Sequence, residues 1–370
     1  MKINTLKWTS RACVALVFCL ILVGALVTSW QAGMAVPDWP LSFGSLNPEG
    51  WWDNFPVRLE HGHRVLAAAV GVAVGILCAG VWGNGRALFI AIGVAVLASV
   101  VGGVLGVSSA MRAHLGIWPA AIAFLVALLL GGANRSNVGR AERNLALVAF
   151  ILVCCQATLG GLRVTRETAG AVDVAVVLRI VHGCIAQAFL VSLVALAVRI
   201  RIVSSAQVHP HAKVRPSNSA AWGWFAVAAV YAQLVLGATM RHLGAGLAIP
   251  TFPASNPDGG WLPQVHNLYT DLNFSHTRVG ALVVSCIVLY SVFKNMRSSK
   301  VGAPVWSGSL RSGLIVVLQV VLGILVVLHQ KPKTLASLHV VLGAALLASL
   351  AAVLVHALSG SSVAVEEESP

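Results

Sequence analysis

The feature that most constrains this chain is a series of apolar runs that are each long enough to cross a lipid bilayer. About 20 apolar residues in a helix span the roughly 30 Å hydrocarbon layer, and we expect ten such helices. Hydrophobic residues make up 58% of the chain and charged residues only 10%, whereas a soluble domain carries about 25% charged residues. The sequence therefore predicts an all-α, polytopic membrane protein. The expected spans are 11–30, 63–83, 87–107, 114–132, 145–163, 178–199, 221–240, 276–294, 310–329 and 335–357.

The net charge of +13 would suggest a nucleic-acid partner in a soluble protein, so the placement of the charges decides its meaning. With the N-terminus inside, 15 of the 25 basic residues fall in inner segments and eight of the 12 acids in outer loops. This pattern predicts a multi-pass protein of the inner (cytoplasmic) membrane with both termini cytoplasmic and no nucleic-acid partner. The first run lacks a small-residue cleavage site, so we expect it to be retained. All seven cysteines lie in apolar runs, which offers no disulfide framework.

Two loop segments show that the chain contains an internal repeat. AGMAVPDWP (32–40) follows the first apolar run, and AGLAIPTFP (245–253) follows the seventh, so their numbering differs by an offset of 213. The same offset carries a glycine upstream of the loop, Gly24, to Gly237. A constant register over such a stretch favours duplication.

A second signature gives a different offset. Gln-x-x-Leu-Gly followed by a histidine that opens the next run occurs at Gln156 with His182, and again at Gln319 with His339. The two glutamines differ by an offset of 163. The second offset is shorter than the first by the length of one transmembrane hairpin. We therefore expect two pseudo-symmetric four-helix bundles in tandem, with an extra helical hairpin inserted at about 85–135.

The halves are expected at 1–205 and 216–358. Each has an even number of helices, so the copies run in the same direction, related by an axis along the membrane normal. The segment 204–219 is expected to be a cytoplasmic linker, and the tail 359–370 to be disordered.

Five histidines, His63, His114, His182, His276 and His339, each sit in the first turn of an even-numbered run, so we expect them all at the outer face. A single histidine there is ordinarily satisfied by water and headgroups, but two pairs that obey the repeat favour a function. Heme suits such pairs, because two imidazoles from facing helices can bind iron and the bundle encloses the macrocycle. A zinc site would need three or four ligands.

Charged residues next to the histidines allow two interpretations each. Arg64 and Arg278 could pair with heme propionates or could lie at the interface as snorkelling side chains. Glu60 lies one turn before His63 and has no acidic counterpart in the second half, where Asn273 stands at the 213 offset. It could hydrogen-bond the ligand, relay protons or stabilise a cationic intermediate, or it could be a solvated acid at a loop end.

The motifs AGMAVPDWP, EHGHR, QATLGGLRV with HGCIAQ, and QLVLGATMRHLGAGLAIPTFP resemble those of the heme A synthase family (CtaA). Members of that family oxidise the C8 methyl group of heme O to a formyl group, which makes heme A for cytochrome c oxidase. The resemblance implies a heme b cofactor between His276 and His339 in the C-terminal half. It implies that the heme O substrate lies between His63 and His182 in the N-terminal half, with Glu60 as the catalytic carboxylate.

The chain departs from the family pattern in ways that leave alternatives open. The added hairpin makes His114 a rival to His182 as a ligand. His276 is followed by Thr277, so the propionate contact that Arg64 would make in the first half would pass to Arg278 in the second. The resemblance points to heme O synthase and cytochrome oxidase as partners, besides the lipid bilayer. The electron donor, the source of the formyl oxygen and the oligomeric state have no signature in the sequence.

Two other classes of function remain open at this stage. A non-catalytic b-type cytochrome would use the same histidines and would bind only heme B, without a need for Glu60. A transporter or an oxidase-assembly factor is disfavoured, because the spans carry no acids and no broken helices at mid-membrane.

Overall fold

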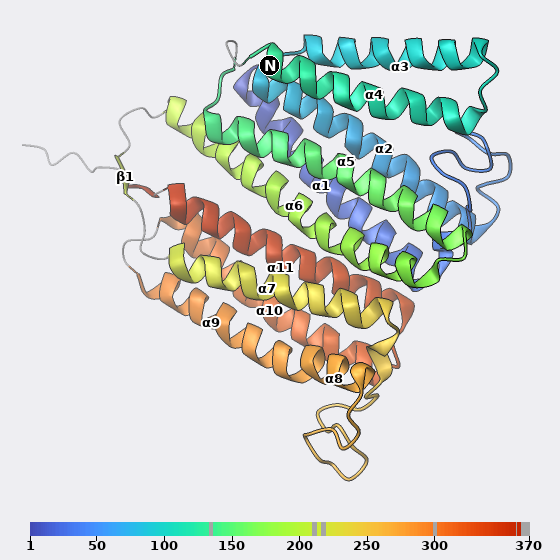
Figure 1. Ribbon diagram of the computed structural model, residues 1–370. Coiled ribbons are helices and arrows are strands. Elements are labelled where there is room, and N and C mark those ends of the chain that lie inside the picture. Colours follow the sequence, from blue (N-terminus) through green and yellow to red (C-terminus); the bar gives the residue numbers. More distant parts are fainter. Residues whose placement is uncertain (133–135, 209–212, 216–219, 299–301, 360, 364–370) are drawn as a thin grey trace, which may run out of the picture. The chain divides into compact units, whose positions relative to one another are not determined.

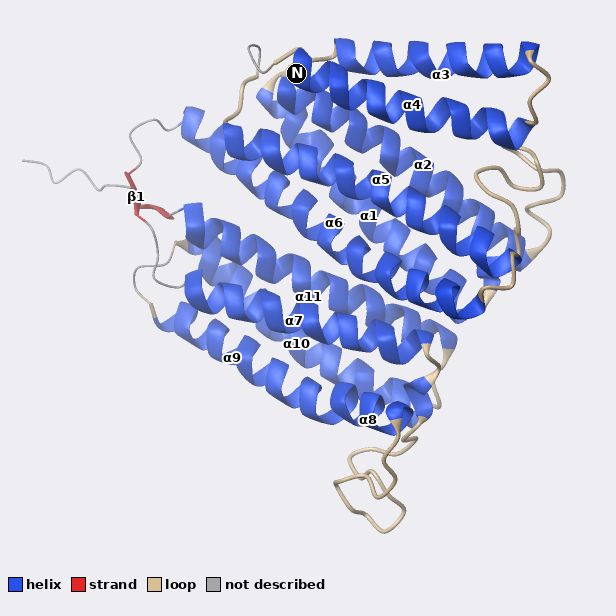
Figure 2. Ribbon diagram, viewed as in Figure 1, coloured by secondary structure: helices blue, strands red, loops and turns tan. Residues whose placement is uncertain are grey.

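The computed structural model describes residues 1–132, 136–208, 213–215, 220–298, 302–359 and 361–363, and it is almost wholly helical (Figures 1 and 2). Within the described residues, ten helices are long and apolar enough to cross a membrane. The all-α prediction and the ten spans are confirmed, and the chain is a multi-pass membrane protein. The helices are α1 (Ile3–Ser29), α2 (Phe55–Trp82), α3 (Arg86–Val104), α4 (Ser109–Leu130), α5 (Arg140–Thr168), α6 (Val172–Val208), α7 (Ala220–His242), α8 (Leu268–Phe274), α9 (Ala281–Arg297), α10 (Ala303–Leu328) and α11 (Lys333–Ser359).

The chain divides into two compact units, Met1–Ile200 and Arg201–Pro370. In the first unit, α2 packs against α1 and α5, while α3 and α4 pack chiefly on each other as a hairpin. In the second unit, α7 contacts α9 and α11, and α10 contacts the same two helices, which closes a ring of four. The duplication of the two halves stays a prediction, although paired contacts described below follow its offsets.

Two short strands, β1 (Lys213–Arg215) and β2 (Ser361–Val363), pair antiparallel in the second unit. They fall within the expected linker 204–219 and the expected tail 359–370. The rest of those two segments, 209–212, 216–219, 360 and 364–370, lies outside the described residues.

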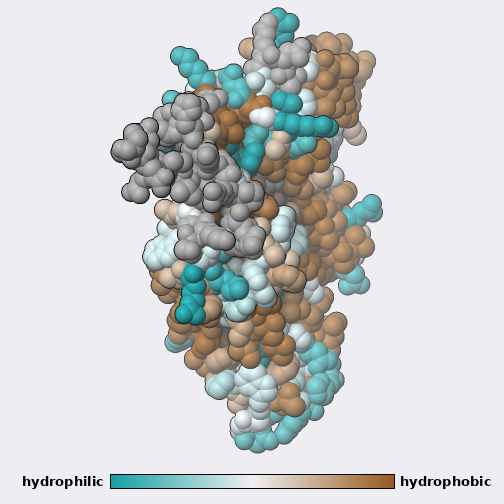
Figure 3. Space-filling view, turned by 90° about the vertical axis from the view of Figure 1, so that its left-hand side faces the viewer, coloured by the Kyte–Doolittle hydropathy of each residue, from teal (hydrophilic) through white to brown (hydrophobic). Residues whose placement is uncertain are grey.

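Large apolar side chains remain on the surface of the helices, as a lipid environment requires. Phe89 of α3 is 77% exposed and Leu130 of α4 is 83% exposed. Hydrophobic residues cover much of the surface that is visible in Figure 3. These side chains cannot be removed from water within one chain, so they face the bilayer in the folded protein.

The helices that carry the histidines begin earlier than their apolar runs. Helix α2 begins at Phe55, where the Asn54 side chain accepts a hydrogen bond from the backbone N–H of Val57 at 3.3 Å. His63 therefore lies eight residues inside α2, and His182 lies ten residues inside α6. The expected first-turn placement of these histidines is wrong, because the residues that precede the expected apolar runs are also helical.

The repeated loops are fixed by arginines that donate to backbone carbonyls. In the first unit, Arg64 donates to the carbonyl oxygens of Asp38 at 2.5 Å, Leu41 at 2.9 Å and Val36 at 2.8 Å. The loop between α1 and α2 is thereby tied to the helix that carries His63.

In the second unit, Arg278 donates to the carbonyl oxygens of Thr251 at 2.6 Å and Ala254 at 2.9 Å. These two positions stand at the 213 offset from Asp38 and Leu41, whereas Arg278 lies one position beyond that offset from Arg64. The extra residue falls in a π-helical turn, η3 (Ser275–Gly280), between α8 and α9. Such a turn inserts one residue into a helix, so the two arginines reach equivalent carbonyls.

Replacing Arg278 by lysine should destabilise the second unit. Arg278 is 1% exposed, and a lysine cannot make all of its hydrogen bonds, so carbonyls are left unsatisfied at a cost of about 2 kcal/mol or more. We expect a lower thermal midpoint of the detergent-solubilised protein and faster proteolysis of the loop 248–266. Arg297→Lys, at the opposite end of α9, is the control and should leave both unchanged. Equal thermal midpoints for Arg278→Lys and Arg297→Lys would show that the hydrogen bonds of Arg278 to the loop do not stabilise the second unit.

Candidate functional site

In the first unit, the rings of His63 and His182 each pack against a glycine of a neighbouring helix. A Cβ added at Gly24 of α1 would lie 3.1 Å from Cε1 of His63, and one at Gly160 of α5 would lie 3.7 Å from Cε1 of His182. The two histidines lie close enough for the charge of His182 to affect His63. The first pair predicted from the repeat is therefore brought together.

The second unit repeats this arrangement. A Cβ at Gly237 of α7 would lie 2.6 Å from Cε1 of His276, and one at Gly323 of α10 would lie 3.0 Å from Cε1 of His339. The ring centroids of His276 and His339 are 6.4 Å apart. Two imidazoles that share one metal ion would have ring centroids about 6 Å apart. Each metal–nitrogen bond is about 2 Å, and each ring centre lies about 1 Å beyond its nitrogen.

Three of the four histidines also have their backbone held by a glutamine. The side-chain amides of Gln156, Gln233 and Gln319 donate to the carbonyl oxygens of His182 at 2.9 Å, His276 at 2.8 Å and His339 at 3.1 Å. Each glutamine precedes its glycine by four residues, so both lie on one helix face. The sequence interpretation recognised this signature twice and missed the copy at Gln233. His63 is the exception, since Leu20 stands four residues before Gly24.

Each of the four paired histidines has one ring nitrogen that is not used in a hydrogen bond. The Nδ1 atoms of all four histidines are buried and have no hydrogen-bond partner. Within the described part of the chain, no cluster of three or more His, Cys, Asp or Glu side chains could hold a metal ion. Paired imidazoles between apolar helices suit a porphyrin iron, which needs only one or two protein ligands.

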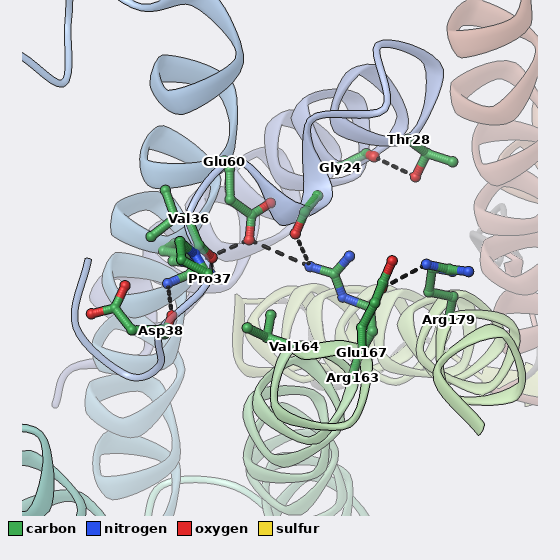
Figure 4. Close-up of polar contacts among 12 residues, drawn as sticks. Gly24, Thr28, Val36, Pro37, Asp38, Glu60, Arg163, Val164, Glu167 and Arg179 are labelled. Atoms are coloured by element: carbon green, nitrogen blue, oxygen red, sulfur yellow. Dashed lines mark hydrogen bonds and ion pairs between the residues drawn. The ribbon is translucent and has the colours of Figure 1, made fainter. Parts of the chain in front are cut away.

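A buried carboxylate adjoins the first pair. Glu60 is 3% exposed, and its Oε1 accepts hydrogen bonds from Nε of Arg64 at 3.1 Å and from Nη2 of Arg163 at 3.4 Å. Its Oε2 is buried without a partner. Figure 4 shows Glu60 of α2 and Arg163 of α5 pointing toward each other. Arg163 lies within electrostatic range of both His63 and His182, so this ion pair borders the two-histidine site.

Sequence reasoning missed Arg163, although it lies in the quoted QATLGGLRV motif, seven residues after Gln156. It also donates to the carbonyl oxygen of Gly33 at 3.0 Å. The signal was available, because an arginine at the end of a membrane helix near a lone acid needs a partner.

The second unit has no equivalent acid. Asn273 is fully buried, and its Nδ2 donates to the carbonyl oxygen of Ala245 at 2.9 Å. Its Oδ1 accepts from Thr277 at 3.2 Å and from Arg278 at 3.3 Å. A satisfied amide cannot take up a proton, so of the two sites only that in the first unit combines two imidazoles with a proton acceptor.

The other predicted site residues lie as follows. The hydrogen bonds of Arg64 and Arg278 go to loop carbonyls and to side chains beside them, so their contact with heme propionates stays a prediction. His114 packs its ring on Trp39, with centroids 5.1 Å apart, and lines a cavity with Trp118. His182 lies near enough to His63 to affect its charge, and the choice of His182 over His114 as the ligand stays a prediction.

Several proteins named heme A synthase are similar to part of this chain. Those of Bacillus cereus strain AH187, B. cereus strain Q1 and Bacillus anthracis strain A0248 are each 32% identical to it over 112 residues, which is 30% of this chain. The match covers about a third, 35%, of the length of each of these relatives.

A family model covers far more of the sequence. The model of the COX15-CtaA family, described as Cytochrome oxidase assembly protein, matches residues 7–351, which include all four paired histidines and Glu60. On that match, this chain belongs to the COX15-CtaA family of cytochrome oxidase assembly proteins.

Proposed function

We propose that this protein is a heme A synthase, an oxidoreductase that converts the C8 methyl group of heme O to a formyl group. Heme O would bind between His63 and His182 of the first unit, and a heme b cofactor would bind between His276 and His339 of the second. The observation that carries the proposal is the asymmetry of two otherwise matched sites, since of the two only the first has a buried carboxylate with an unpartnered oxygen. Similarity to relatives with this name supports it.

The residues of the first unit suit the chemistry of the proposed reaction. Turning a methyl group into an aldehyde is a four-electron oxidation that breaks two C–H bonds and adds one oxygen atom from water or O2, so the site must pass on electrons and take up protons. Glu60 Oε2 is free to accept one, while Arg64 and Arg163 hold Oε1 and fix the orientation of the carboxylate. The apolar helices around the pair exclude water, which protects a reactive intermediate.

The second unit would contribute electron transfer. A heme b held by two histidines supplies reversible one-electron chemistry at iron. The protein's part is to orient the two imidazoles, through Gln233 and Gln319 on their backbones and Gly237 and Gly323 beneath their rings. At the position of Glu60 this site has Asn273, which is not an acid. A cofactor that only transfers electrons is not itself transformed and needs no group to take up protons.

The membrane arrangement belongs to the same proposal. The excess of basic residues in the predicted inner segments supports an inner-membrane protein with both termini cytoplasmic. Heme O synthase and cytochrome oxidase are then the expected neighbours in the pathway, with an external electron donor.

The function is tested by co-expression with a source of heme O, followed by chromatography of the extracted hemes. A heme A synthase yields heme A or its hydroxylated precursor. A non-catalytic b-type cytochrome would yield heme B alone, and that result would refute the proposal.

Substituting Glu60 by glutamine should separate binding from turnover. Glutamine keeps the shape of the side chain but cannot accept the proton, so heme A formation should fall about 100-fold or more while the Soret spectrum is retained. The control is Glu167→Gln, which removes the ion pair between Glu167 of α5 and Arg179 of α6. Undiminished heme A in the Glu60 variant would remove this residue from the mechanism.

Adding a single methyl group at Gly237 should weaken heme retention in the second unit. Its Cβ would lie 2.6 Å from the His276 ring, which must then move, whereas a Cβ at Gly313 of α10 would meet only ordinary contacts, at 3.5 Å or more. We expect Gly237→Ala to retain heme about tenfold less tightly, a cost of about 1.4 kcal/mol, and Gly313→Ala to match the parent. The measurement is the reduced-minus-oxidised absorbance per mole of protein. Identical spectra would show that the ring does not depend on this glycine.

A further inference from the structure

Helix α4 of the inserted hairpin lines one side of a cavity in the first unit, and the proposed reaction does not involve this cavity. The cavity has a volume of about 150 Å³ and lies between α4, α5 and the loop that follows α1. Its walls include Trp39, His114, Trp118, Thr158, Gly161 and Thr165.

The cavity and the ring of His182 both lie against helix α5. Gly160 of α5 packs against the His182 ring, and the next residue, Gly161, packs beneath the indole of Trp39, where an added Cβ would lie 2.7 Å from the ring. Trp39 belongs to the loop that Arg64 ties to α2. Of these two adjacent glycines on α5, Gly160 contacts the histidine site and Gly161 contacts the wall of the cavity.

The lining favours an uncharged hydrocarbon. Trp39 stacks near Trp118, with centroids 6.1 Å apart and ring planes 27° apart, and no Asp, Glu, Lys or Arg is among the described residues that line the cavity. The hydroxyls of Thr158 and Thr165 donate to the carbonyl oxygens of Cys154 and Leu162 in their own helix. These hydroxyls are therefore already satisfied, and little polar surface is left to attract a polar ligand.

The cavity is also open toward lipid. Leu162, which contributes to its wall, is 40% exposed on the membrane-spanning helix α5. A chain longer than the cavity can therefore continue outside it, along the helix surface and into the bilayer.

The second half lacks the residues that make this space. At the repeat offset of 163, Thr158, Gly161 and Thr165 correspond to Val321, Ile324 and Leu328, and the sequence of that half has no counterpart of the inserted hairpin. The cavity thus lies in the half assigned to the substrate. Heme O differs from heme B in bearing a farnesyl chain, and the half that would bind heme O is the half that has the cavity.

We propose that this cavity binds part of the isoprenoid tail of heme O and so selects heme O over heme B at the His63–His182 site. The inference rests on the proposed function and assigns a purpose to the inserted hairpin. An apolar cavity of about 150 Å³ can hold a benzene-sized group, which corresponds to about one isoprene unit of the tail. The remainder of the chain extends into lipid.

The test is a comparison of heme O and heme B binding to purified protein by absorbance titration. The titration of His182→Ala is subtracted, so that the difference reports the first-unit site. Thr158→Phe fills the cavity from a lipid-facing position, and Thr158→Val is the matched control of nearly equal volume. We expect the parent and the valine variant to bind heme O at least about tenfold more tightly than heme B, and the phenylalanine variant to lose this preference while its affinity for heme B is unchanged.

The outcomes separate the inference from the proposed function. Equal affinities for the two hemes in the parent, or a preference that survives in Thr158→Phe, would overturn the cavity assignment, as would occupation of the cavity by a lipid chain alone. If neither heme gives a signal that depends on His182, the proposed function fails and the cavity assignment fails with it.

Discussion

The close approach of an imidazole ring to a neighbouring helix underlies the whole candidate site. Each of the four paired histidines lies against a glycine, and an added Cβ would come closer than ordinary contact to the ring at Gly24, Gly237 and Gly323, while Gly160 leaves ordinary contact distance. A glycine in the middle of a helix costs about 1 kcal/mol relative to alanine, so its repeated use there requires a compensating interaction. The ring that it admits has a buried Nδ1 without a partner, which is costly in an apolar bundle unless the imidazole serves as a ligand.

The two sites differ in acidity at one position, which holds Glu60 in the first unit and Asn273 in the second. Glu60 in the first unit is held by two guanidinium groups through one oxygen, which leaves the other oxygen buried and free. Its counterpart Asn273 uses both of its polar atoms in hydrogen bonds. Under the proposed function, the first site would manage protons and the second would only hold a cofactor.

Much of this could be predicted from the sequence, because the bilayer imposes a length on each helix and the repeat imposes a register on the histidines. The ten spans, the two histidine pairs and the isolated acid all follow from those constraints. The depth of the histidines in their helices could not, because each helix begins several residues before the apolar run by which the sequence marks the span. Nor could the equivalence of Arg64 and Arg278, since the π-helical turn that shifts the register by one residue has no signature in the sequence. Arg163 was missed because it comes from another helix, far from Glu60 along the chain.

The central claim is that iron is bound by one imidazole from each of two helices, once in each unit. Anomalous scattering at the iron absorption edge, from crystals of the protein loaded with both hemes, tests this most directly. The account predicts two iron peaks, one between His276 and His339 and one between His63 and His182. A peak bound to other side chains, or no peak between His276 and His339, would contradict it.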